Sequence, residues 1–241
     1  MNVFLVGSQM IEWDDMAAFL ESEVSDWSSD SVVPAEILVE TAGRLCYMSF
    51  GNPRPGGNAA YIRNILEKGH GSVLEHAVFS FIFIGVSRSL THELIRHRHF
   101  SVSELSQRYV DRDEAVYICP DIIAEDHDSL GEWEDAVESS HCSYRNLSET
   151  IPSEDRKVVN GARRSTLLEC SETKIFVTGN ARCWRNFIEQ RASKHADQEI
   201  RQLANKVLEK LQIAAPSIFC DYRWEILGDG THAVDTPNRK V

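Results

Sequence analysis

Runs of β-branched and aromatic residues mark the predicted strands. The clearest is AVFSFIFIG at residues 77–85, which combines the residue types favoured in a buried strand. TKIFVT at residues 173–178 has the same character, and residues 2–6 form a shorter apolar run. Residues 217–224 are only weakly strand-like. These four segments are the strands that we expect.

Helical patterns occupy much of the remaining chain. Residues 34–48 read as a helix opened by a proline in its first turn, and residues 58–68 as a second helix with Asn58 as its N-cap. A short helix is expected at 87–97, and SVLE at residues 72–75 has the spacing of a capping box. Further helical segments and irregular segments complete this list: helices at 130–149, 153–168 and 180–214, and loops at 51–58 and 111–128.

The longest predicted helix is the last one in the chain. Residues 180–214 read as one continuous helix that ends before Pro216. Strands and helices do not alternate regularly, which disfavours a doubly wound parallel sheet. We therefore expect one α+β domain over residues 1–241, with a mostly antiparallel sheet packed against several helices, including one long C-terminal helix.

Composition narrows the class of protein. The net charge of −12 disfavours a general nucleic-acid binder, which normally carries a basic surplus. Six cysteines are spread along the chain without a C-x-x-C pair, as is typical of reduced cytosolic thiols. No signal-peptide pattern opens the sequence, and residues 77–85 are too short to span a membrane. We expect a cytoplasmic protein that binds neither nucleic acid nor membrane.

One stretch, RHRHFSVSELSQRY at residues 96–109, contrasts with the acidic background. Arginine presents a planar fork of donors that matches phosphate and carboxylate oxygens. Arg96 and Arg98 cannot share a helix face, so the stretch indicates a helix end followed by a loop around a small anion. The alternative is a solvated basic turn paired with Glu104 and Asp111. His97 and His99 lack the spacing of zinc ligands, and we expect no metal site.

The long predicted helix carries a second cluster. On a helical projection Arg191 and His195 fall within roughly 60° of Ile188, inside the apolar arc. A buried arginine is costly without a partner, so Arg191 is expected to meet a ligand or a structural carboxylate. Asn180 is a candidate N-cap for this helix, whose free N–H groups favour anions.

Other single residues point less clearly to function. His70 and His76 flank the capping-box pattern, where a lone histidine is more often structural than catalytic. Cys119 precedes a proline and has Asp111, Asp113 and Glu114 nearby in sequence. Acidic neighbours raise a thiol pKa, so we expect Cys119 to be inert.

Together these motifs resemble one family. RHRHFSVSELS fits R-H-R, seven residues and serine, the signature of flavin-dependent thymidylate synthases. GHGSVLEH resembles that family's H-x-[ST]-x-x-E-H segment. SRSLTHELIRHR resembles the helix that leads into the signature. VTGNARCWRNFIEQRASKHADQEIR resembles its C-terminal helix. The resemblance covers about residues 35–110 and 155–215.

The resemblance implies a reaction and an assembly. FAD reduced by NADPH takes part in moving a methylene group from methylenetetrahydrofolate to the uracil ring of dUMP, and a flavin hydride completes the methyl group of dTMP. Enzymes of this type need no cysteine nucleophile, in agreement with an inert Cys119. They form homotetramers whose active sites are shared between subunits.

Site residues follow from the same resemblance. Arg191 matches the catalytic arginine that polarises the uracil. His70 matches a histidine near the flavin ring and the folate. Flavin contacts are implied for Ser72, Glu75, Arg96, His97, Arg98, Glu104, Asn180, Arg182, Asn186 and His195. Nucleotide contacts are implied for Glu93, Arg96, Glu104, Ser106, Gln107, Arg108, Arg164 and Arg191.

Two of these positions depart from the family pattern. STLLE follows Arg164, where many members have VLP, so Arg163 stays an alternative for the arginine that is donated across the subunit interface. Glu93 replaces a common glutamine, and a carboxylate there can only accept hydrogen bonds. Two other classes of function stay open beside the synthase: a non-catalytic nucleotide-binding module, and a histidine-based metal hydrolase.

Overall fold

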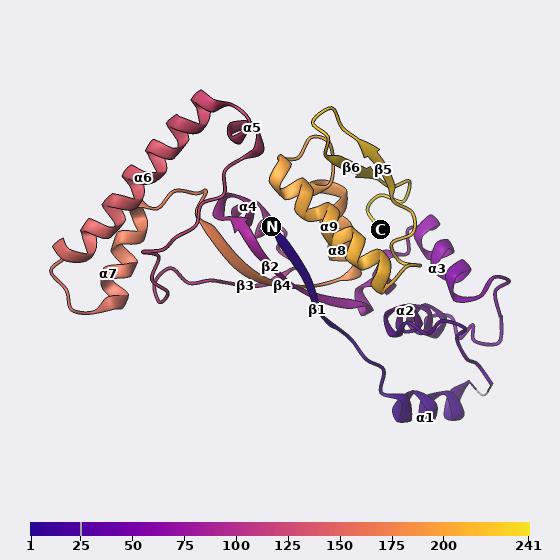
Figure 1. Ribbon diagram of the computed structural model, residues 1–241. Helices are drawn as coiled ribbons and strands as arrows, with labels where there is room; N and C mark the ends of the chain where they lie inside the picture. Colours follow the sequence, from indigo (N-terminus) through magenta and orange to yellow (C-terminus); the bar gives the residue numbers. More distant parts are fainter. Residues whose placement is uncertain (25) are drawn as a thin grey trace. The chain divides into compact units, whose positions relative to one another are not determined.

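The computed structural model describes residues 1–24 and 26–241 and shows a mixed α+β protein, as predicted (Figure 1). Its strands are β1 (Asn2–Ser8), β2 (Val78–Ser87), β3 (Ser101–Glu104), β4 (Glu172–Asn180), β5 (Arg223–Ile226) and β6 (His232–Asp235). Its α-helices are α1 (Trp13–Glu23), α2 (Pro34–Leu45), α3 (Gly57–Glu67), α4 (Arg88–Leu94), α5 (Asp121–Ala124), α6 (His127–Thr150), α7 (Arg156–Arg163), α8 (Ala181–Arg191) and α9 (Gln198–Ala214). Two 3₁₀ turns are η1 (Gly71–His76) and η2 (Arg164–Thr166).

The chain groups into two compact units. The first unit contains residues 1–2, 82–96 and 102–176, and the second contains residues 3–81, 97–101 and 177–241. Strands β2 and β4 each contribute residues to both units. The expectation of a single domain over the whole chain stays a prediction.

The strands form two sheets. The larger has four strands in the order β1-β2-β4-β3, so the two most apolar predicted strands occupy its centre. Phe79, Phe81 and Phe83 alternate along β2 and are almost fully buried, which is the period-two pattern of a core strand. The smaller sheet pairs β5 with β6 in antiparallel register, Arg223 opposite Asp235. Of the weakly strand-like segment 217–224, only residues 223 and 224 belong to a strand, β5; residues 217–221 form turns.

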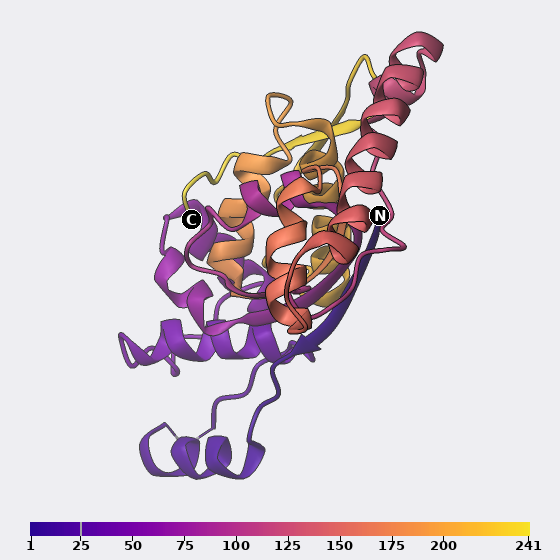
Figure 2. The same ribbon diagram turned by 90° about the vertical axis from the view of Figure 1, so that its left-hand side faces the viewer.

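Two helices build the core of the second unit. Helices α8 and α9 pack side by side (Figures 1 and 2). Trp184 on α8 is fully buried, its ring lies 4.8 Å from that of Phe81, and its Nε1 donates to the carbonyl oxygens of Phe79 and Gly179 at 3.2 and 3.0 Å. One aromatic side chain therefore fixes α8 on the ends of β2 and β4, because its polar atom is satisfied by both strands.

The prediction of one continuous helix over 180–214 is wrong. Helix α8 ends at Arg191 and α9 begins at Gln198, with turns between them. His195 lies in those turns and is exposed, so its expected place on the apolar arc of the helix is also wrong.

Hydrogen bonds from residues outside α8 explain the break. The carbonyl oxygen of Ala192 accepts from the Val234 N–H of β6 at 2.9 Å. The guanidinium of Arg201, itself buried, donates to the carbonyl oxygens of Lys194 and Ala196 at 3.4 and 3.1 Å. These carbonyls are satisfied outside a helix, so continuing α8 brings them no further gain.

The first unit contains the helical pair α6 and α7, which lie alongside each other (Figures 1 and 2). Helix α4 begins as predicted: the hydroxyl of Ser87 accepts from the Leu90 N–H at 3.0 Å, a standard N-cap. The predicted loop at 111–128 contains the short helix α5 and the start of α6.

Two predicted caps do not form. Asn58 lies inside the first turn of α3, and Gly56 is the N-cap residue. The Asn58 amide instead donates to the Glu36 carbonyl oxygen and the Glu40 carboxylate, at 3.1 and 2.8 Å. The capping box at 72–75 is also wrong, since η1 is a 3₁₀ turn preceded by His70 without a side-chain cap. Within residues 1–24 and 26–241 every helix is too short or too polar to cross a membrane.

Candidate functional site

The signature histidine and the arginine of α8 meet directly. The Arg191 Nε–H donates to Nε2 of His97 at 3.1 Å, so that histidine nitrogen carries no proton and the neutral ring holds its proton on Nδ1. Burial and, to a smaller extent, the nearby positive charge of Arg191 together lower the pKa of His97 to about 4. His97 is therefore neutral at pH 7 and acts as an acceptor that orients Arg191.

Aromatic packing holds His97 in place. Its ring lies edge-on to Phe187 of α8, with centroids 5.3 Å apart, and 6.1 Å from Phe100. Phe100 fits against Gly179, where an added Cβ would lie 2.4 Å from the Phe100 ring. The backbone of β4 can approach this ring only without a side chain at position 179. Gly179 in the segment VTGN therefore allows the turn at residues 97–100 to pack closely against α8.

The N-terminus of α8 contributes the next groups. The Asn180 side chain caps the helix by accepting from the Cys183 N–H at 2.9 Å, as predicted. The second residue of α8, Arg182, forms an ion pair with Glu75 of η1 at 2.7 Å. Both side chains are about half exposed, so the pair orients each partner more than it stabilises the fold.

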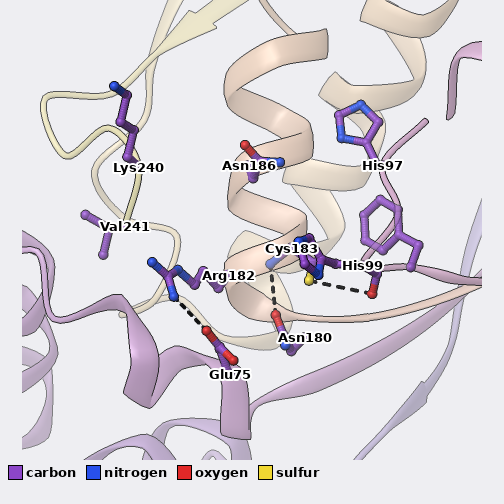
Figure 3. Close-up of a pocket in the computed structure, with 10 residues that line it drawn as sticks. Glu75, His97, His99, Asn180, Arg182, Cys183, Asn186, Lys240 and Val241 are labelled. Carbon is purple, nitrogen blue, oxygen red and sulfur yellow. Dashed lines mark hydrogen bonds and ion pairs between the residues drawn. The ribbon is translucent and has the colours of Figure 1, made fainter. Parts of the chain in front are cut away.

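These groups surround a cavity of about 500 Å³ in the second unit, a volume within the usual range of ligand sites (Figure 3). Five predicted flavin residues line it: Glu75, His97, Asn180, Arg182 and Asn186. The sequence analysis missed five further lining residues: His99, Phe100, Cys183, Lys240 and Val241. We call this the α8 cavity.

Other predicted flavin residues are not among the ten described residues that line the α8 cavity. Ser72, Arg98 and His195 are exposed in the second unit, and the predicted folate neighbour His70 is exposed there as well. Arg96 is exposed and belongs to the first unit.

The first unit contains a second cavity, of about 440 Å³. It is lined by Arg88, Gln107, Gly161, Arg164, Ser165, Leu167, Leu168 and Glu169. Two predicted nucleotide residues, Gln107 and Arg164, therefore share one cavity within one chain. Arg88 was missed, although it lies in the quoted segment SRSLTHELIRHR. We call this the Arg164 cavity.

A carboxylate orients Arg88. Oε1 of Glu104 accepts from Arg88 NH1 at 3.1 Å and from the Thr91 hydroxyl at 2.9 Å. Glu104 thus binds a cation of its own unit, whereas the resemblance assigned it to flavin and nucleotide. The ion pair fixes the plane of the Arg88 guanidinium, and with it the directions in which its other N–H donors point.

Two adjacent arginines have different environments. Arg163 is 2% exposed, its NH2 and NH1 donate to Asp111 and Asp113 at 2.6 and 3.0 Å, and its guanidinium lies 4.2 Å from the Tyr144 ring centroid. Arg164 is exposed and lines the cavity. A buried arginine with this many partners has a structural role, which leaves Arg164 as the arginine able to meet a ligand.

The remaining nucleotide residues lie in the first unit. Glu93 is half-buried on α4, and its carbonyl oxygen accepts from the Arg96 N–H at 3.2 Å. Ser106 opens a turn: its hydroxyl accepts from the Arg108 N–H at 3.4 Å, and its carbonyl oxygen accepts from the Val110 N–H at 3.0 Å. The Arg108 side chain is exposed.

The environments of Cys119 and Cys183 both disfavour the thiolate form. Burial raises the pKa of Cys119, with added repulsion from Glu134 and Asp121. The predicted direction is confirmed, but the responsible carboxylates differ from those near it in sequence. Burial also raises the pKa of Cys183, the thiol of the α8 cavity. Among the described residues, no three His, Cys, Asp or Glu side chains are arranged to hold a metal ion.

Comparison with known proteins gives a consistent result. The family model described as "Thymidylate synthase complementing protein" matches residues 30–217. A flavin-dependent thymidylate synthase of Mycolicibacterium gilvum is 45% identical over 223 residues, covering 88% of this chain and 89% of the relative. The Corynebacterium glutamicum enzyme of the same name is 44% identical over 223 residues, with 88% and 89% covered. That of Mycobacterium bovis is 42% identical over 230 residues, with 91% and 92% covered. The chain therefore belongs to the family of flavin-dependent thymidylate synthases.

Proposed function

We propose that this protein is a flavin-dependent thymidylate synthase, which converts dUMP to dTMP with methylenetetrahydrofolate as carbon donor and NADPH-reduced FAD as hydride donor. The observation that carries the proposal is the neutral His97 bonded to Arg191 beside a cavity that five flavin-matching residues line. Family membership at 42–46% identity supports the same activity.

The α8 cavity has the donor set that a flavin dinucleotide needs. Arg182 provides a cation, Asn180 and Asn186 provide amides, and Phe100 provides an apolar surface for a ring system. The capped N-terminus of α8 adds the positive end of a helix dipole. Reduced FAD, when bound, supplies the hydride that completes the methyl group. Ser72, Glu75, Arg96, His97, Arg98, Glu104 and His195 are proposed as further flavin contacts, and His70 as a neighbour of the folate.

Arg191 is the proposed catalytic residue. Its guanidinium is half-buried, and its Nε–H is already committed to His97, which fixes the plane in which its other donors lie. A cation in a partly dry site stabilises charge that develops on a uracil oxygen more strongly than it does in water. His97 therefore acts as a positioning residue: it removes one degree of freedom from Arg191 and adds no charge of its own.

The Arg164 cavity is the proposed source of phosphate contacts for dUMP. Arg88 and Arg164 provide two cationic forks, and Gln107 provides an amide. Glu93, Arg96, Glu104, Ser106 and Arg108 complete the proposed set, with Glu104 acting in part by orienting Arg88.

The assembly is also a proposal. We infer a cytoplasmic homotetramer with shared active sites and a mostly antiparallel four-stranded sheet. Apolar side chains that stay exposed on the sheet of one chain, Phe4 at 47% and Phe176 at 41%, support burial against further copies. Arg164 is then donated across the subunit interface.

Flavin binding tests the function most directly. The purified protein should be yellow, and its flavin absorbance should bleach when NADPH is added under anaerobic conditions. A colourless protein that binds dUMP but cannot be reconstituted with FAD would instead support a non-catalytic nucleotide-binding module. Stoichiometric zinc, measured by atomic emission, would support a metal hydrolase.

Subunit mixing tests donation of Arg164. Arg164→Ala and Arg191→Ala subunits are each expected to be nearly inactive, and mixing them should restore part of the activity if one complete site can form from two chains. Each variant remixed with itself is the control. Without rescue, Arg164 would act within its own chain, next to Gln107.

A further inference from the structure

The segment after β6 forms one wall of the α8 cavity. Lys240 and Val241 are lining residues, and Figure 3 shows them on the opposite side of the view from His97. No motif in the sequence pointed to this segment, and the family model ends before it, at residue 217. Its role must therefore be argued from its contacts.

A buried ion pair anchors the segment. Arg185 of α8 is 2% exposed and binds Asp221 through both terminal nitrogens, at 2.7 and 2.8 Å. Arg185 NH2 also donates to the Asn238 carbonyl oxygen at 3.3 Å, and the Asn238 amide donates to Asp221 at 2.9 Å. Thr236 adds a hydroxyl donor to the same carboxylate. Residues 236–238 are thereby tied to the core of the second unit.

The backbone beyond this anchor is held in an unusual conformation. Lys240 has φ of 63°, in the left-handed region that non-glycine residues rarely adopt, and its N–H donates to Glu189 at 2.9 Å. Val241 is 5% exposed and packs on η1, where a Cβ on Gly71 would lie 2.8 Å from its backbone. A left-handed lysine costs on the order of 1 kcal/mol or more and persists only where surrounding contacts impose it.

The charges of the cavity show what this arrangement can do. Its two cations are Arg182 and Lys240, and its one acidic lining residue among those described, Glu75, is already paired with Arg182. The Lys240 ammonium therefore adds a second positive side chain to the lining. Arg239, one residue earlier, is paired with Asp235 at 2.5 Å and does not line the cavity.

We propose that Lys240 is an additional ligand-binding residue, which acts with Arg182 to bind the diphosphate of a dinucleotide in the α8 cavity. This inference rests on the proposed function, which supplies two such dinucleotides, FAD and NADPH. Lysine binds phosphate as a mobile point charge, so its fixed backbone and flexible side chain suit a diphosphate whose oxygens it can follow. Asn238 and Asp221 are positioning residues for this contact.

Binding to the protein freed of flavin tests the proposal. Lys240→Gln should raise the Kd for FAD by about fivefold to tenfold, because one charge-assisted hydrogen bond is lost. Riboflavin, which has no phosphate, should bind both forms equally. Arg239→Gln is the matched control, since it removes the same charge from the same segment, and its FAD affinity should equal that of the wild type.

Each outcome has a defined meaning. An unchanged Kd for FAD with a raised KM for NADPH would assign the diphosphate to the reductant, whereas an unchanged value for both would overturn the inference. An equal loss of riboflavin affinity, or an equal effect of Arg239→Gln, would also overturn it, because the effect would then be steric or a matter of general charge. Failure of the wild type to bind FAD would overturn the proposed function itself.

A double-mutant cycle tests the anchor. Asn238→Ala removes the hydrogen bond that the Asn238 side-chain amide donates to Asp221, and as a single substitution it should weaken FAD binding. In the Lys240→Gln background the same change should have little effect, because the segment then has no charge left to position. Additive losses would show that Asn238 does not act through Lys240 and would overturn its positioning role.

Discussion

The arginines at the two cavities are oriented by different kinds of partner. Beside the α8 cavity, burial keeps His97 neutral, so this acceptor orients Arg191 without adding a charge of its own. In the Arg164 cavity, Arg88 is oriented by the Glu104 carboxylate, which offsets part of its charge. A neutral acceptor orients a cation without offsetting its positive charge. Such a cation is suited to stabilise negative charge that develops during a reaction. An anionic partner suits the steady recognition of a doubly charged phosphate.

The largest expected effect tests the first half of this comparison. Arg191→Ala should lower kcat by about 10²- to 10³-fold, the usual loss when one aligned donor to a developing charge is removed. FAD should stay bound, because Arg191 is not among the residues that line the α8 cavity. Turnover of dUMP and the flavin spectrum of the purified variant measure the two quantities. Near wild-type formation of dTMP would refute the catalytic role.

The second prediction separates two adjacent arginines. Arg163→Ala should lower the free energy of unfolding by about 3 kcal/mol, because two aspartates lose their buried partner. Arg164→Ala should change it by less than about 0.5 kcal/mol and should nearly abolish activity, chiefly by raising the KM for dUMP. Urea unfolding and steady-state kinetics of both variants measure this contrast. Equal destabilisation would show that Arg164 also has a structural role.

The third prediction concerns the neutral histidine. The pKa of His97 is about 4 in the folded protein and about 6.5 when unfolded, so the unfolded chain binds more protons between these values. This contribution to stability is complete above pH 6.5 and is lost as the pH falls toward 4. His97→Gln keeps an acceptor for Arg191 but does not titrate. The wild type should therefore lose stability relative to this variant on acidification, as measured by urea unfolding at pH 7, 6, 5 and 4.

Parallel pH curves for the two proteins would count against a buried neutral His97. The same titration can be followed by NMR of the His97 ring, which should become half-protonated only near pH 4.

The smallest effect concerns the ion pair between two lining residues of the α8 cavity. Glu75 and Arg182 are about half exposed, so Glu75→Gln should change the free energy of unfolding by less than about 1 kcal/mol. FAD affinity should change only slightly, since the amide still accepts from Arg182. Glu67→Gln on α3, also exposed, is a matched control for removal of one charge. A loss above 2 kcal/mol would mean that the pair is stabilising and not merely orienting.

Local signals predicted much of the fold. The strands at 77–85 and 173–178 were found because β-branched and aromatic runs seldom have another role, and α2 begins at its predicted proline. Arg191 stood out because a charged residue fell on an apolar arc of a helix. His195 misled by the same logic, since the break after Arg191 depends on hydrogen bonds from Val234 and Arg201 that no local pattern reveals.

The sequence by itself determined the family, the central strands and the basic signature, because these depend on short-range patterns of residue type. Only the tertiary structure decided which arginine of the adjacent pair is buried, that His97 is neutral, and that residues 240 and 241 line the α8 cavity. The physical reason is common to all three. Burial and charge compensation are properties of the side chains that surround a residue in space, and these come from segments as far apart in the chain as Glu75 and Val241.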